Sequence, residues 1–98
     1  MRNFRFEPAF HEWHLVDVGT EEVLHNMVEP SDILVGYRTV GEIENLCREE
    51  LISADISYSE KLDYNGVLLD NKNRLDQIEE IPIAAKVMAE ALYNYYIK

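Results

Sequence analysis

The chain has 98 residues, 47% of them hydrophobic, which excludes a disordered chain and predicts one domain over residues 1–98. Nineteen acidic residues against nine basic ones give a formal net charge of −10. This charge argues against direct contact with nucleic acid or an anionic membrane, because both need clustered Lys and Arg. One cysteine, no secretory signal and no apolar run long enough to cross a bilayer together predict a cytoplasmic protein.

The acidic residues are unevenly distributed along the chain. Between Phe6 and Tyr37 there is no Lys or Arg, although the same span contains Glu7, Glu12, Asp17, Glu21, Glu22, Glu29 and Asp32. From Val40 to Glu60, several further carboxylates are opposed only by Arg48. Such a field attracts a basic surface and speeds encounter with it, although an acidic surface also serves to keep a small protein soluble.

Three strands are predicted at the start of the chain. The alternation over residues 2–6 favours a short strand with Phe4 and Phe6 facing the core, and Pro8 is expected to end it. Two segments rich in β-branched residues, separated by a turn that contains glycine, then predict a hairpin over residues 12–27.

The register of this hairpin depends on the length of its turn. A two-residue loop pairs His14 with His25 and sets Asp17 against Glu22, where like charges repel. We prefer a loop one residue longer, because it gathers apolar side chains on one face. Its pairs include Trp13 with Met27 and Asp17 with Val23, and its apolar face comprises Trp13, Leu15, Val23 and Met27.

A turn, a short strand and a helix are predicted next. Pro30–Asp32 has turn composition, and the apolar run Ile33–Val35 is interpreted as an edge or linking strand. Thr39 and Glu42 then fit a capping box, in which each side chain bonds the backbone N–H of the other, and this predicts a helix over residues 40–53. Its apolar face contains Val40, Ile43, Leu46, Cys47 and Leu51.

A second hairpin is predicted over residues 55–70. Asn65 and Gly66 tolerate the positive φ angles that a type I′ turn requires. Ile56 and Tyr58 are candidates to extend its first strand. The register fixed by this turn pairs Tyr64 with Val67, Leu62 with Leu69 and Lys61 with Asp70, which agrees with cross-strand chemistry.

The C-terminal segment predicts a long helix. It is expected to begin between Glu79 and Pro82, because proline is tolerated in the first turn of a helix, and to run to about Tyr96. Its polar residues recur at a spacing of four and cover about a third of the circumference, so most of the helix must be buried or shared. These residues are Lys86, Glu90, Asn94 and Lys98.

Together these elements predict an α+β fold. A small antiparallel sheet built from two hairpins is expected to pack against the long C-terminal helix and one shorter amphipathic helix. The expected order of elements is β-β-β-α-β-β-α, with no domain boundary inside the chain.

No residue pattern predicts catalysis. His11 and His14 are three apart and would share a face only in a helix, whereas this segment is predicted as a strand. No pattern of metal-ligand spacing supports them, so both are interpreted as surface residues, together with His25. Cys47 lies at an apolar helix position, where a thiol is buried and inert, and Glu49-Glu50 do not face each other on a helix. We therefore expect no enzyme, no cofactor and no metal.

Small size, acidity and the lack of a catalytic motif resemble the acidic inhibitor proteins of phages and of toxin–immunity pairs, some of which mimic nucleic acid. The resemblance is one of composition and carries no residue assignment. It implies a stoichiometric anti-defence, anti-CRISPR or immunity-type inhibitor whose carboxylates meet the basic surface of a nuclease, effector or toxin. The residues predicted to face this partner are Glu42, Glu44, Glu49 and Glu50 on the helix, with Glu21 and Glu22 in the first hairpin.

The alternative interpretation is a non-catalytic structural or adaptor protein that self-associates as a homodimer through its C-terminal helix. Tyrosine has an apolar ring and a polar tip, so it serves both cores and interfaces. Tyr93, Tyr96 and Ile97 are the residues predicted to form this contact.

Overall fold

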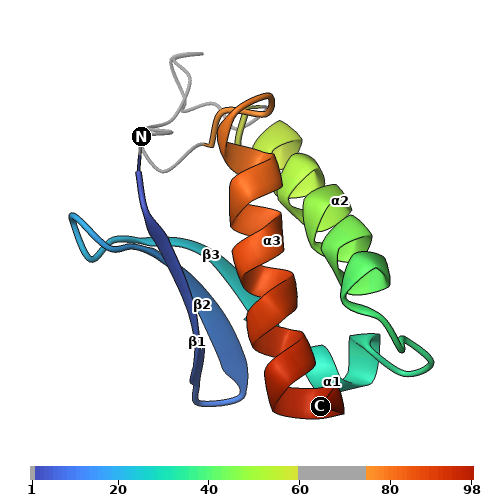
Figure 1. Ribbon diagram of the computed structural model, residues 1–98. Coiled ribbons are helices and arrows are strands. Elements are labelled where there is room, and N and C mark those ends of the chain that lie inside the picture. The colour runs from blue at the N-terminus through green and yellow to red at the C-terminus, as the bar shows by residue number, and fades with distance from the viewer. Residues whose placement is uncertain (1, 60–74) are drawn as a thin grey trace.

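The computed structural model describes residues 2–59 and 75–98, and it has an α+β architecture (Figure 1). Its elements are β1 (Phe4–Ala9), β2 (Glu12–Asp17), β3 (Val23–Val28), α1 (Pro30–Ile33), α2 (Val40–Ser59), α3 (Glu80–Leu92) and the π-helical turn η1 (Tyr93–Ile97). The strands form an antiparallel sheet in the order β1-β2-β3, and α3 packs on both α2 and β1. The sheet is one layer of the molecule, and α2 and α3 form the other.

Strand β1 continues through Pro8 to Ala9, so the prediction that Pro8 ends the strand is wrong. Pro8 pairs with Trp13, and β1 is an edge strand of the sheet. An edge strand tolerates proline because the missing N–H can face away from the ladder. The inward orientation of Phe6 is confirmed, and Phe4 packs half-buried against the same core.

The hairpin of β2 and β3 contains a register shift. The predicted pair of Trp13 with Met27 is confirmed, which gives this end of the hairpin the register of the longer loop. Nearer the turn a β-bulge shifts the pairing by one residue, so the predicted pair of Asp17 with Val23 is wrong. A bulge turns the following side chains to the opposite face. Leu24 is accordingly buried, whereas Val23, expected on the apolar face, is exposed.

The segment after β3 forms the short helix α1 and not a strand, so the prediction of a strand over Ile33–Val35 is wrong. Pro30 occupies the first turn, where its missing N–H removes no helical bond. The N–H of Leu34 bonds to the carbonyl of Pro30 at 2.9 Å. Leu34 is buried and Ile33 is exposed. The prediction failed because an apolar run of three residues does not by itself distinguish a strand from the end of a helix.

Helix α2 begins with the predicted capping box. The N–H of Thr39 bonds to Glu42 Oε1 at 3.1 Å, and the N–H of Glu42 bonds to Thr39 Oγ1 at 3.2 Å. The helix continues to Ser59, well beyond the predicted end near Ser53. The predicted order with a second hairpin is therefore wrong, since Asp55 to Ser59 are helical, and the rest of that hairpin lies outside the described residues.

Helix α3 begins at Glu80, inside the predicted range, and ends at Leu92, where η1 continues the chain. The four predicted polar positions, two in α3 and two beyond it, are exposed. The opposite side of α3 supplies the buried residues Ile81, Ala84, Ala85, Met88, Ala89 and Leu92. These join Leu15 and Met27 of the sheet and Ile43 and Cys47 of α2 in one core. Within the described ranges, none of the helices has the length and apolarity that crossing a bilayer requires.

Candidate protein-binding site

Three aromatic side chains meet where η1 lies against the sheet. Trp13 of β2 is buried, and its indole Nε1–H donates a hydrogen bond to the hydroxyl of Tyr96 at 3.1 Å. The ring of Tyr95 meets Trp13 edge-on with centroids 5.1 Å apart, and it meets Tyr96 in the same way at 4.8 Å. Edge-to-face packing is the favoured aromatic geometry, so the three rings form a stable cluster. Tyr95 remains 63% exposed, so the cluster opens to solvent.

The π-helical turn brings both tyrosines onto Trp13. The N–H of Lys98 bonds to the carbonyl of Tyr93, five residues earlier, and not to the carbonyl four residues earlier as in an α-helix. Turns of this kind occur as single interruptions and are frequent at functional sites. Figure 1 places the β1–β2 turn, α1 and the C-terminal end of η1 at the same end of the molecule.

A cavity of about 400 Å³, hereafter the aromatic pocket, lies over this cluster. Trp13, Tyr95 and Tyr96 line it, and the exposed residues His11, Glu29 and Asp32 form its rim. The rim consists of the β1–β2 turn and the segment after β3. A hydrogen bond from the N–H of Glu29 to the carbonyl of His11, at 3.1 Å, holds them together.

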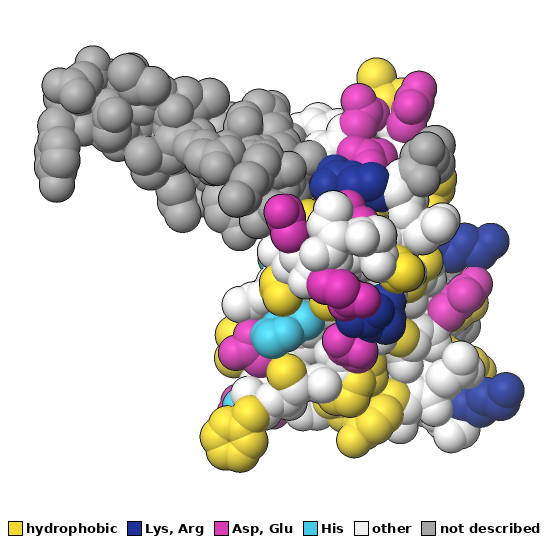
Figure 2. Space-filling view, turned by 90° about the vertical axis from the view of Figure 1, so that its left-hand side faces the viewer, with side chains coloured by type: hydrophobic (Ala, Val, Ile, Leu, Met, Phe, Trp, Pro, Cys, Tyr) yellow, Lys and Arg dark blue, Asp and Glu magenta, His cyan; other side chains and the backbone are white. Residues whose placement is uncertain are grey.

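The same end of the molecule exposes several large apolar side chains. Phe10, in the β1–β2 turn, is 86% exposed, and Val28, Ile33, Val35, Val40 and Ile97 in neighbouring segments are also exposed. Figure 2, which looks onto the outer side of the sheet, shows hydrophobic side chains gathered toward this end. Clustered exposed apolar surface is typical of contact sites for other proteins.

The span without Lys or Arg folds into the sheet layer. Residues 7–36 make up the second half of β1, all of β2 and β3, and α1, so the seven carboxylates of this span lie in one layer, which also contains Arg5 in the first half of β1. Figure 2 shows Asp, Glu and His side chains on the outer side of that layer. Among the described bases, Arg38, Lys86 and Lys98 form no ion pair, and all three lie on or next to the helices.

The four carboxylates predicted on α2 are not brought together as one group. Glu50 faces the sheet, where its Oε1 lies 3.0 Å from His25 Nε2. Glu44 lies 4.0 Å from Arg48, and Glu42 is held in the capping box. Six residues at about 100° each separate Glu44 from Glu50, which places them about 120° apart on opposite flanks of the helix. Glu42 and Glu49 face solvent.

The predicted acids of the β2–β3 turn have different environments. Glu21 pairs with Arg5 at 2.7 Å, and this hydrogen bond lowers the pKa of Glu21. Arg5 also holds Glu7 at 2.9 Å, so one cation serves two carboxylates. Glu22 is half-buried and, among the described residues, forms no ion pair. Glu21 and Glu22 lie at the opposite end of the sheet from the aromatic pocket.

The predicted aromatic contact residues lie at the end of the terminal helix. Tyr93 is half-buried against the core, whereas Tyr96 and Ile97 are 38% and 36% exposed. The structure brings only Tyr96 into the aromatic pocket. Tyr93 instead borders a separate cavity of about 430 Å³ with Arg38 and Glu90.

Each histidine lies beside a carboxylate. His14 Nε2 is 2.6 Å from Glu12 Oε2, and His11 Nδ1 is 3.8 Å from Glu29 Oε1. His25 lies opposite Leu15 and not opposite His14, in agreement with the register we preferred. His25 is buried, so its interpretation as a surface residue is wrong. In the described part of the chain no three His, Cys, Asp or Glu side chains are arranged to hold a metal ion.

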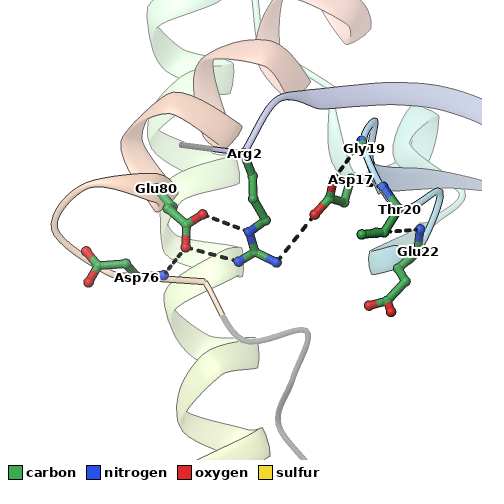
Figure 3. Close-up of polar contacts among 7 residues, drawn as sticks. All are labelled: Arg2, Asp17, Gly19, Thr20, Glu22, Asp76 and Glu80. Atoms are coloured by element: carbon green, nitrogen blue, oxygen red, sulfur yellow. Dashed lines mark hydrogen bonds and ion pairs between the residues drawn. The ribbon is translucent and has the colours of Figure 1, made fainter.

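Away from the aromatic pocket, a polar cluster joins the start of the sheet to α3 (Figure 3). Arg2 donates from Nε to Glu80 Oε2 at 2.8 Å and from Nη2 to Glu80 Oε1 at 3.0 Å. This hydrogen bonding lowers the pKa of Glu80. Arg2 also lies 3.8 Å from the buried Asp17, whose Oδ1 accepts the N–H of Gly19 at 2.8 Å in the hairpin turn. Because these side chains bond to one another, the cluster stabilises the packing of α3 against the sheet.

The rim of the aromatic pocket was not predicted from the sequence. Glu29 and Asp32 were named only among the carboxylates of the span without Lys or Arg, His11 was weighed only as a metal ligand with His14, and Trp13 was placed on the apolar face of the hairpin. No local sequence pattern points to this site, because its residues come from segments that are distant in the chain. No protein-family model matches the chain, and comparison with curated proteins and with solved structures finds no match either.

Proposed function

We propose that this protein is a small, acidic, non-catalytic inhibitor of the phage or mobile-element type, which binds one basic target protein stoichiometrically. Target classes that fit are a nuclease, a defence effector or a toxin. The observation that carries the proposal is that residues 7–36 hold seven carboxylates and no Lys or Arg, while the described cations that form no ion pair lie on or next to the helices. Such asymmetry orients a basic partner toward the sheet layer and speeds its association.

The test begins with affinity capture by the tagged full chain, followed by titration calorimetry with the purified partner and an assay of its activity. We expect one-to-one binding, loss of the partner's activity and a dissociation constant that rises steeply with salt. Binding that does not change with ionic strength would contradict the proposal.

Two matched variants localise the contact. Changing Glu12 and Asp32 in the sheet layer to Lys should weaken binding, whereas changing Glu49 and Glu90 on the helices to Lys alters the net charge equally and should have a smaller effect. Equal losses in both variants would mean that net charge alone, and not the sheet layer, determines binding.

Self-association is the second candidate function. Exposed Tyr95, Tyr96 and Ile97 lie at the same end of the molecule as the exposed Phe10, which favours an apolar contact there. Sedimentation velocity over a wide concentration range decides this, because a homodimer should dissociate on dilution and should be lost in Phe10→Ser.

A further inference from the structure

The lining of the aromatic pocket favours a positively charged group. The faces of aromatic rings are negative and attract cations. Tyr95 and Tyr96 supply exposed rings that pack on the buried Trp13, and Glu29 and Asp32 supply carboxylates at the rim. None of the described lining residues is Lys or Arg. The two carboxylates would repel an anion, and an apolar group would gain nothing from them.

The backbone at the rim is held in an unfavourable conformation. His11 has a φ of 61° and Glu29 a φ of 43°, in the left-handed region that only glycine adopts easily. Such positions are destabilising and gather at ligand-binding sites, where surrounding structure fixes them. Here the bond from Glu29 N–H to the His11 carbonyl fixes both, and Asp32 N–H bonds to the Glu29 carbonyl at 3.1 Å.

The pocket is surrounded by aromatic side chains of the kind found at the centre of protein–protein interfaces. Exposed Phe10 lies directly next to His11, with their rings 4.1 Å apart, and Tyr95 stands at the mouth. Aromatic residues at the centre of an interface, paired with an arginine on the partner, supply most of the binding energy in many complexes.

We propose that the aromatic pocket receives an arginine side chain from the partner protein. A guanidinium is planar, so it stacks on an aromatic face and at the same time donates paired hydrogen bonds to a carboxylate. A lysine ammonium is a hydrated point charge and can use only part of this arrangement. The inference rests on the proposed function, because it names the group of the basic target that this site recognises.

The test follows the single tryptophan of the chain by nuclear magnetic resonance. The indole Nε1–H of Trp13 gives one isolated signal, and it lies inside the proposed site. Isotope-labelled full chain is titrated with an acetylated, amidated Gly-Arg-Gly peptide, and with matched peptides that carry lysine or citrulline. We expect a saturable shift of the indole signal with a dissociation constant on the order of millimolar for arginine. Binding of the uncharged citrulline peptide should be roughly tenfold weaker or undetectable.

Variants that replace the rim carboxylates by neutral side chains test whether the rim binds the arginine. Glu29→Gln and Asp32→Asn together keep the shape of the pocket and should weaken arginine binding by about tenfold. Glu49→Gln with Glu90→Gln removes the same charge from the helices and should leave binding unchanged. The backbone signals of each variant report whether it is folded. Tyr95→Leu should weaken binding as well, since it removes the most exposed ring.

Three results would overturn the inference. These are the absence of a shift, an equal response to citrulline, and an indole signal that moves with protein concentration alone, which would make a second copy the occupant. If arginine peptides fail while the full chain still inhibits a basic target, the proposed function stands without this pocket. If arginine binds here and no basic target is found, the pocket stands and the inhibitor proposal fails.

Discussion

At the scale of single residues, the pair of Arg2 and Glu80 connects the start of the chain to the start of α3. Their side chains are only 27% and 17% exposed, so water screens the pair less than it screens a surface pair. Arg2 precedes the first strand, and Glu80 opens α3 and also accepts the N–H of Asp76 at 2.9 Å. The loss of Glu80 would remove from the partly buried Arg2 an ion pair that is shorter than its pair with Asp17.

We expect Glu80→Gln to lower the free energy of unfolding by about 1–2 kcal/mol at neutral pH. Because the hydrogen bond from Arg2 lowers the folded pKa of Glu80, its contribution is complete above the unfolded pKa of about 4.3 and is lost as pH falls through the folded value. Denaturant unfolding of both proteins should therefore converge in acid. Glu79→Gln, an exposed neighbour with the same charge change, is the control and should have little effect. A difference independent of pH would contradict this account.

Cys47 illustrates how packing determines reactivity. The thiol is fully buried on α2, and burial, with Glu50 and Glu44 nearby, raises its pKa to about 12. We expect no reaction with a chromogenic disulfide reagent in the native protein at mildly alkaline pH, and one equivalent after denaturation. Rapid labelling of the native protein would show that α2 and α3 separate readily.

At the scale of elements, the sequence predicted local signals well and the ends of elements poorly. Thr39 and Glu42 are close in the chain and interact directly, so their capping box could be predicted from spacing alone. Helix α2 runs past Ser53, and residues 52–59 contain neither Gly nor Pro to end it. The alternation of Ile56 and Tyr58 favoured a strand there, but two residues are too few to establish a period. The bulge lies where Leu24 joins the core formed with the helices. The sequence of the hairpin alone contains no signal for this packing.

The attachment of η1 to the sheet depends on Tyr96, and Tyr96→Phe should destabilise the protein by about 1–2 kcal/mol. The substitution keeps the ring but leaves the buried Trp13 N–H without its acceptor. Thermal unfolding measured by tryptophan fluorescence reads both stability and the environment of Trp13. Tyr95→Phe is the matched control, since the Tyr95 hydroxyl forms no hydrogen bond with the described residues. Equal losses in the two variants would rule out the indole bond as the cause.

At the scale of the whole molecule, the aromatic pocket assembles from parts that are far apart in sequence. Trp13 and Tyr96 are separated by 83 positions, and Glu29 reaches the rim only because β3 returns beside the β1–β2 turn. Composition gives the acidic character, because net charge depends on totals, whereas the class of partner stays a prediction. The site itself required the fold, since no local pattern places Tyr95 over Trp13.

The net charge of −10 has a consequence for stability that can be measured without a partner. Like charges repel across the compact molecule, so screening should stabilise it. Raising sodium chloride from about 0.01 M to about 0.15 M shortens the screening length from about 30 Å to about 8 Å, and we expect the melting temperature to rise. Glu49→Lys reduces the net charge by two at an exposed position outside any described ion pair, and it should reduce this salt dependence. A melting temperature that falls with salt would mean that pairs such as Arg2 with Glu80 and Arg5 with Glu21 outweigh the repulsion. In that case the carboxylates of the sheet layer would be largely compensated within the protein, and less of the acidic field would remain to attract a basic partner.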